Sequence, residues 1–162
     1  MYDKLDTLVQ KKDIRKSEII EHPSYVNELA HYIMQDLKEF RKIQGDDTLG
    51  GMVICETSEQ ARRLYDVFQE EWQKYQPKPI KIKLPDGTFV VGEPEVDYKS
   101  KYRPLKAGII LHDTDDKETR KQTVKDFKKN MTVDILIVFN MLLTGFDAPR
   151  LKRLYFGRKL KD

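Results

Sequence analysis

Residues 134–149 read DILIVFNMLLTGFDAP, and this stretch decides the fold. It opens with an almost uninterrupted apolar run, Ile135–Phe139, which is typical of a strand buried on both faces of a parallel sheet. A polar loop follows at once. Because the ligands of open α/β sheets gather beyond the carboxyl ends of the strands, we expect this loop to carry binding chemistry.

Three residues of the loop suit contact with an anion. Thr144 offers a hydroxyl, Gly145 allows a backbone or a phosphate to approach closely, and Asp147 places a carboxylate ahead of a stiff proline. The loop is thus a candidate site held by a rigid strand.

Two more apolar runs predict strands, at residues 50–55 and 107–112, and each is followed by a helical pattern. Alternation of strand and helix implies right-handed crossovers and a parallel sheet. All three strand exits then face the same edge. The polar residues expected there are Thr57, Ser58, His112, Asp113, Thr114, Asn140, Thr144, Gly145 and Asp147. We predict one shared ligand surface, which an extended polyanion would satisfy.

Helix boundaries are predicted from capping residues and apolar spacing. The first long helix follows Pro23, with Ser24 as a candidate cap, and stops at Gly45. A capping box of Thr57 and Gln60 begins the next helix, whose apolar stripe buries Trp72.

The last helix is predicted from Asp115 to about Asn130, with Asp113 or Thr114 as its cap. Its expected inner face is Val124, Phe127 and Met131. Because the remaining residues are charged, we expect this helix on the outside of the sheet.

Residues 76–105 interrupt the α/β pattern. Alternating apolar residues flank Asp86 and Gly87, which is a β-hairpin signature. We expect an insertion that protrudes from the sheet. Tyr98 and Tyr102, among basic residues, suit either a solvated loop or contact with nucleic acid.

Composition indicates one rather polar globular domain, because 35% of the 162 residues are charged and 39% are apolar. The formal net charge of +3 is too small to indicate nucleic acid by itself. Cys55 is the single cysteine, which excludes an internal disulfide, and we expect it to pack as a small hydrophobe. No run is long and apolar enough for a membrane helix, and we expect a cytoplasmic protein.

Residues 141–149, MLLTGFDAP, resemble motif V of superfamily 2 helicases. Their form is similar to that of the motor (R) subunit of type I restriction endonucleases, with nine consecutive residues and no gap. The resemblance extends from about Gly50 to the end, apart from the insertion. It implies a three-layer RecA-like α/β lobe with a mainly parallel sheet, the second helicase lobe, over residues 23–162, preceded by a connector at residues 1–22.

The resemblance further implies a role in an ATP-dependent translocase on double-stranded DNA, coupled to endonuclease cleavage of foreign DNA. ATP and Mg²⁺ would be its cofactors. Its partners would be a first RecA-like lobe of the same protein and the methylation and specificity subunits. Thr144 and Gly145 would contact the DNA backbone, together with Thr57, Ser58 and Asn140. Gly145 and Asp147 would couple that contact to the nucleotide.

The parts needed for hydrolysis are missing. The sequence has the Gly-x-x-x-x-Gly spacing at Gly87 to Gly92, followed by Glu93, and at Gly45 to Gly50, followed by Gly51, whereas a phosphate loop needs lysine at the next position. The chain also ends where the family's arginine-bearing motif VI would begin. We therefore expect a fragment that neither hydrolyses ATP nor translocates alone.

Other interpretations stay open. The helicase could belong to another superfamily 2 branch, or the chain could be a non-catalytic α/β interaction domain. Asp86, Asp97 and Lys99 imitate the pattern of a Mg²⁺-dependent restriction nuclease. The basic residues after Pro149 (Arg150, Lys152, Arg153, Arg158, Lys159 and Lys161) either follow a phosphate backbone or form a solvated strand edge.

Overall fold

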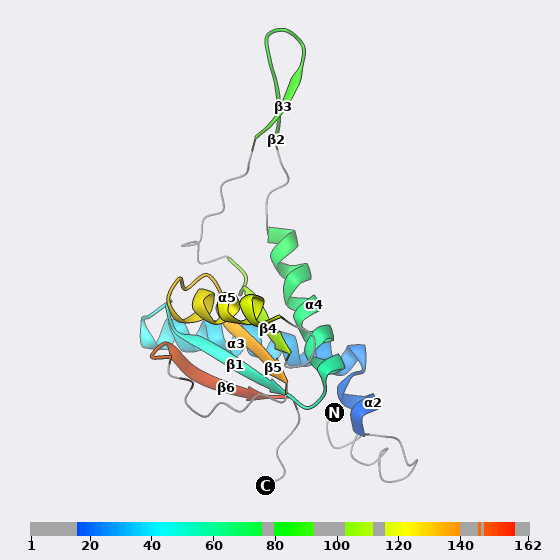
Figure 1. Ribbon diagram of the computed structural model, residues 1–162, viewed down its shortest axis with the longest axis vertical. Helices are drawn as coiled ribbons and strands as arrows, with labels where there is room; N and C mark the ends of the chain where they lie inside the picture. The colour runs from blue at the N-terminus through cyan, green and yellow to red at the C-terminus, as the bar shows by residue number, and fades with distance from the viewer. Residues whose placement is uncertain are drawn as a thin grey trace.

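The chain folds around one four-stranded parallel sheet, seen in the computed structural model of Figure 1. The structure describes residues 16–75, 80–92, 103–111, 116–139, 146 and 148–157. In spatial order the strands are β4 (Ala107–Leu111), β5 (Ile135–Phe139), β1 (Gly50–Cys55) and β6 (Leu151–Phe156). The predicted α/β class and parallel sheet are therefore confirmed, and the segment after Pro149 adds a fourth strand.

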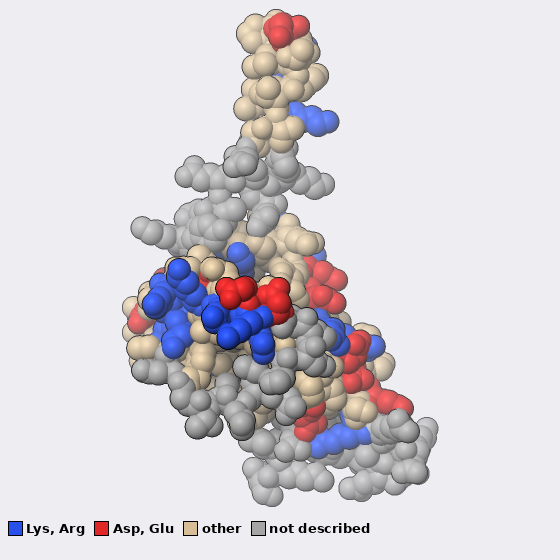
Figure 2. All heavy atoms as spheres, in the orientation of Figure 1, with Lys and Arg blue, Asp and Glu red and all other residues tan. Residues whose placement is uncertain are grey.

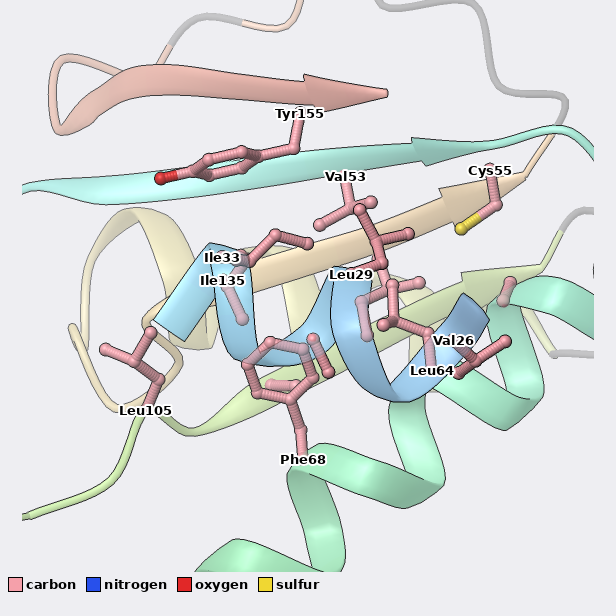
Figure 3. Packing of buried hydrophobic residues seen from close by; sticks show 14 of the residues in the cluster. Val26, Leu29, Ile33, Val53, Cys55, Leu64, Phe68, Leu105, Ile135 and Tyr155 are labelled. Carbon is pink, nitrogen blue, oxygen red and sulfur yellow. The ribbon is translucent and has the colours of Figure 1, made fainter. Parts of the chain in front are cut away.

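Helices cover both faces of this sheet and give three layers. The long helix α3 (Pro23–Gln44), which follows the short α2 (Lys16–Ile20), shares one face with α4 (Ser58–Tyr75). The other face is covered by α5 (Lys117–Lys128). Figure 3 shows the larger core, in which side chains of α3 and α4 meet those of the sheet.

The central strand β5 explains why its sequence is apolar without interruption. Ile135 and Ile137 point into the core beneath α3 and α4, whereas Leu136 and Val138 point towards α5. All four are at most 1% exposed. A strand with helices on both sides needs apolar residues at every position.

The strand register brings the three predicted exits to one edge. Phe139 at the end of β5 pairs with Cys55 of β1 on one side and with Leu111 of β4 on the other. The three strands therefore end at the same level, as predicted. We call this the carboxyl edge.

The capping of α3 differs from the prediction. His22, not Ser24, is its N-cap, and the His22 Nδ1 accepts the backbone N–H of Ser24 at 3.1 Å. Pro23 occupies the first turn, where its missing N–H costs nothing. The helix stops at Gly45 as predicted, because that residue has a φ of +66°, a conformation that favours glycine.

The helix α5 also begins later than predicted. Its N-cap is Asp116, whose carboxylate accepts the N–H of Thr119 at 2.6 Å, so the helix does not begin at Asp115. The predicted caps Asp113 and Thr114 lie outside the described residues. Phe127 lies in the core as predicted, but Met131 is 47% exposed and has a φ of +56°, so it is not part of the inner face.

The predicted hairpin is confirmed as β2 (Ile80–Lys83) paired antiparallel with β3 (Phe89–Gly92). Figure 1 shows it standing away from the sheet. Its turn is fixed by Asp86, whose Oδ1 accepts both the N–H and the hydroxyl of Thr88. Gly87 has a φ of +85° in this turn, so the Gly-x-x-x-x-Gly pattern is a hairpin and not a phosphate loop.

Opposite the carboxyl edge, the buried carboxylate of Asp134 binds arginines from distant segments. Arg41 lies 2.8 Å from Oδ1, and Arg103 lies 2.7 Å from Oδ2. Arg150 lies 4.0 Å away and donates to the carbonyls of Phe127 and Val133. Arg150 is 5% exposed, so it neither lies on a solvated strand edge nor can follow the phosphate backbone of a nucleic acid.

Arg153 lies 3.2 Å from the Asp36 carboxylate on α3, and its side chain is 42% exposed. Of the predicted basic cluster, Lys152 is exposed. Arg158, Lys159 and Lys161 lie outside the described residues. Neither interpretation of the basic residues after Pro149 therefore holds for the buried Arg150, whereas Arg153 is a partly exposed residue of β6.

Candidate binding surface at the carboxyl edge

Thr57 stands at the carboxyl edge and begins α4, as predicted. Its Oγ1 accepts the N–H of Gln60 at 3.0 Å, which satisfies one of the unpaired donors of the helix start. The same hydroxyl donates to the carboxylate of Glu21 at 2.7 Å. Because its proton is committed to a carboxylate, Thr57 is poorly placed to donate to a phosphate.

Ser58, the next residue, is only partly buried and keeps more of its hydrogen-bonding capacity. Its Oγ accepts a long bond, 3.4 Å, from the guanidinium of Arg62 one turn along α4. A hydroxyl and a guanidinium at the start of a helix can both donate hydrogen bonds to one anion. The sequence pattern singled out Ser58 but not Arg62, although i,i+4 spacing on the predicted helix would have paired them.

Gln60 has a larger role than the predicted capping box gives it. Its side chain is fully buried, and its Oε1 accepts the N–H of Glu56 at 3.0 Å instead of the N–H of Thr57. Its Nε2 donates to the carbonyl of Gly157 at 2.5 Å. Gln60 therefore ties the exit of β1 to the exit of β6.

Gly157 is fixed from three directions at this point. Its carbonyl also accepts the hydroxyl of Tyr25 from α3 at 3.0 Å, and its N–H donates to Ile54 at 2.8 Å. A Cβ at position 157 would lie 2.4 Å from Gln60 Oε1, so the contact requires glycine. These bonds set the direction in which the chain leaves β6.

The residues of the central loop, Asn140, Thr144, Gly145 and Asp147, lie outside the described residues, as do His112, Asp113 and Thr114. Their two anchors are described. Phe139 ends β5 at the carboxyl edge, and Phe146 packs on Phe127 of α5, with 6.3 Å between the ring centroids. The predicted contacts of these residues stay predictions.

Cys55 ends β1 and is buried, as predicted for a small hydrophobe. Burial raises the pKa of its thiol to about 12, so the thiol is protonated at neutral pH and is a poor nucleophile. Within the described residues no group of three His, Cys, Asp or Glu side chains is arranged to hold a metal ion. Trp72 is core as predicted, at 4% exposed, with Arg103 and Lys106 over its ring.

The molecule is thus a three-layer α/β domain in which the ends of β1, β4 and β5 meet at one edge of a parallel sheet. Residues 95–162 match the family described as type I restriction enzyme subunit R domain 3. A Methanocaldococcus jannaschii protein named "Putative type I restriction enzyme MjaVIIIP endonuclease subunit" is 28% identical over 169 aligned residues. The chain is therefore similar to type I restriction enzyme R subunits, as the resemblance carried by residues 141–149 implied.

The two matches differ in extent. The family match includes β4, α5, β5 and β6, whereas the alignment with the M. jannaschii protein covers 96% of this chain. The chain spans 15% of the length of that protein. Among the described helices, none combines the length and the apolar character that crossing a membrane requires.

Proposed function

We propose that this chain is the second RecA-like lobe of the DNA-translocating motor in a type I restriction enzyme R subunit, within residues 23–162. One observation carries the proposal. The loop at residues 140–149 directly follows the central buried strand, whose end is in register with two neighbouring strand ends. Motif V residues belong at such a position, because a rigid sheet then holds them against the ligand.

In this proposal the carboxyl edge binds the backbone of double-stranded DNA. Thr144 and Gly145 would contact phosphates, with Asn140 beside them. On the described side of the edge, the hydrogen bonds favour Ser58 with Arg62 over Thr57, because the Thr57 hydroxyl is held by Glu21. The hydroxyl and the guanidinium can each donate a hydrogen bond to an oxygen of the same phosphate.

ATP and Mg²⁺ would bind between this lobe and a first lobe. The chain's own residues do not fit the triphosphate alone, because neither Gly-x-x-x-x-Gly of the sequence is followed by lysine, and the one at Gly87 to Gly92 forms a hairpin. The first lobe would therefore hold the phosphates and the metal. Gly145 and Asp147 would face that lobe and couple DNA contact to the bound nucleotide.

The wider role follows from the same proposal. The R subunit would act in the cytoplasm with the methylation and specificity subunits, and motor motion would lead to cleavage of foreign DNA. The isolated chain would neither hydrolyse ATP nor translocate. Support comes from the name of the relative, an endonuclease subunit, together with the family match.

The test uses the whole R subunit with Asp147→Asn. We expect DNA-stimulated ATP hydrolysis to fall about 100-fold, since a coupling residue contributes mainly when the lobes close. Binding of duplex DNA should change little. ATP hydrolysis and DNA affinity are measured on the same preparation.

The matched control is Asp47→Asn, which removes an exposed carboxylate far from this edge in the turn before β1. It should leave both measurements at the wild-type level. Wild-type hydrolysis in Asp147→Asn, or an equal loss in the control, would refute the proposed role.

A further inference from the structure

The outer surface of α5 carries a regular row of cations. Lys117, Lys121, Lys125 and Lys129 follow one another at intervals of four residues, so they share one face of the helix. All four side chains are exposed. Figure 2 shows blue side chains, with a smaller red group between them, over the region where Figure 1 draws α5. We call these four residues the lysine row.

The lysine row borders an open hollow with a volume of about 590 Å³. Arg120 and Lys128 complete its cationic lining, and Ile110 and Val124 supply the apolar part. Six of the eight lining residues are thus cationic and none is acidic. The hollow is a concave positive surface, which concentrates anions more than a flat one does.

The acidic residues of the same segment do little to neutralise the row. Asp126 Oδ1 accepts from the amides of Gln122 and Asn130, both at 2.8 Å, and Asp116 caps the helix. Glu118 lies 3.9 Å from Lys121, and its side chain is 86% exposed. Residues 116–129 hold six cationic and three acidic side chains, an excess equal to the net charge of the whole chain, +3.

The lysine row lowers the stability of the helix on which it lies. Like charges four residues apart destabilise a helix, and the row contains three such pairs. A surface that served only solubility would intersperse the two signs. The arrangement becomes favourable when an extended anion lies along the helix.

We propose that the lysine row binds the sugar-phosphate backbone of double-stranded DNA. The row spans about 18 Å along the helix, a length over which one strand presents about five phosphates. Among the described residues, the lining has no aromatic side chain on which unpaired bases would stack, which favours a duplex over a single strand. α5 covers a face of the sheet, so most of the row lies on that face, and its Lys117 end follows the exit of β4 from the carboxyl edge.

This inference deepens the proposed function, because it rests on duplex DNA being the track of the motor. Its test is binding of a fluorescein-labelled duplex of mixed sequence to the 162-residue chain over a range of KCl concentrations. The variant changes all four lysines of the row to alanine. Because each lost phosphate contact removes about 0.9 from the salt slope, we expect the slope to flatten by about 3 to 4 and the affinity to fall at least about tenfold.

The matched control removes the same charge elsewhere, with Lys16, Lys42, Lys74 and Lys83 changed to alanine; all four are exposed and lie on other elements. It should bind within about twofold of wild type, with a slope near the wild-type one, because those charges do not line one surface. An unchanged slope in the lysine-row variant, or an equal loss in the control, would overturn the inference. Equal binding of wild type to polyglutamate and to duplex would do so as well.

Failure here and failure of the proposed function give different results. If the whole R subunit lacks DNA-stimulated ATP hydrolysis but the chain binds duplex through the lysine row, the motor proposal fails and this inference stands. If the chain does not bind duplex while the whole protein hydrolyses ATP on DNA, this inference alone fails.

Discussion

Asp134 organises the end of the sheet that faces away from the candidate site. Its carboxylate accepts from Arg41 at the end of α3, from Arg103 ahead of β4, and from the N–H of Lys106 at 2.8 Å. Arg150, just before β6, completes the group. One side chain thus links segments separated by up to 93 residues.

We predict that Asp134→Asn destabilises the fold by about 3–5 kcal/mol, because it leaves buried guanidinium groups without a counter-charge. The measurement is the free energy of unfolding in urea at pH 7. Glu118→Gln, which removes a carboxylate that is 86% exposed, is the control and should change stability by less than about 0.5 kcal/mol. Equal effects of the two changes would show that the Asp134 network adds no more to the free energy of unfolding than an exposed carboxylate does.

Among the described elements, the β2–β3 hairpin is the most exposed to solvent. Phe89, Val90 and Val91 are 44% to 67% exposed, and Asp86 bonds within the turn itself. The hairpin is held by its own register and its own turn chemistry. The nuclease-like pattern thus begins at a turn residue; Asp97 and Lys99 lie outside the described residues.

We predict that replacing residues 80–92 with a short Gly-Ser linker leaves the midpoint of thermal unfolding within about 3 °C of wild type, because the hairpin adds little buried apolar surface to the core. Circular dichroism at increasing temperature measures this midpoint. A decrease comparable to that of Asp134→Asn would mean that the insertion packs on the sheet and supports it.

At this same scale the sequence predicts which elements exist better than where they begin. Apolar periodicity is a property of ten or more residues, so α3, α4 and the central strand are predictable. A cap depends on one or two bonds. His22 and Asp116 cap their helices because they stand at the right φ and ψ, and neighbouring Ser24 offered an equally plausible side chain.

For the molecule as a whole, acid stability follows from the same carboxylate. Burial tends to raise the pKa of Asp134, but hydrogen bonds from Arg103 and the charges of Arg41 and Arg103 outweigh it and hold this pKa below the ordinary value of 3.8. A carboxyl with a lowered pKa stabilises the fold above its unfolded pKa, and this contribution is lost as the pH falls through the folded value.

We therefore predict that the free energy of unfolding declines more steeply below about pH 4 in wild type than in Asp134→Asn, since the variant has no proton to take up at this position. Urea titrations between neutral pH and the acid limit of the fold measure the two slopes. Parallel curves would mean that other carboxyls govern acid unfolding.

The candidate site was only partly accessible from sequence. Strand alternation predicts the common edge, because parallel strands fix where their ends lie, and the family motif supplies Thr144, Gly145 and Asp147. The ties made by Gln60 and the inward turn of Arg150 were not predictable. Each of these contacts joins residues far apart in the sequence, separated by 97 positions for Gln60 and Gly157 and by 102 for Arg150 and Thr48. A pattern of neighbouring residues does not predict such contacts.

The two margins of the sheet are unequal. β4 is buried along nearly its whole length, whereas β6 leaves Leu154 51% exposed and Phe156 42% exposed on the side of α5. The β6 margin therefore presents exposed apolar side chains, whereas the side chains of β4 are mostly buried. A segment that crossed this margin on the side of α5 would cover those two side chains and remove their apolar surface from water.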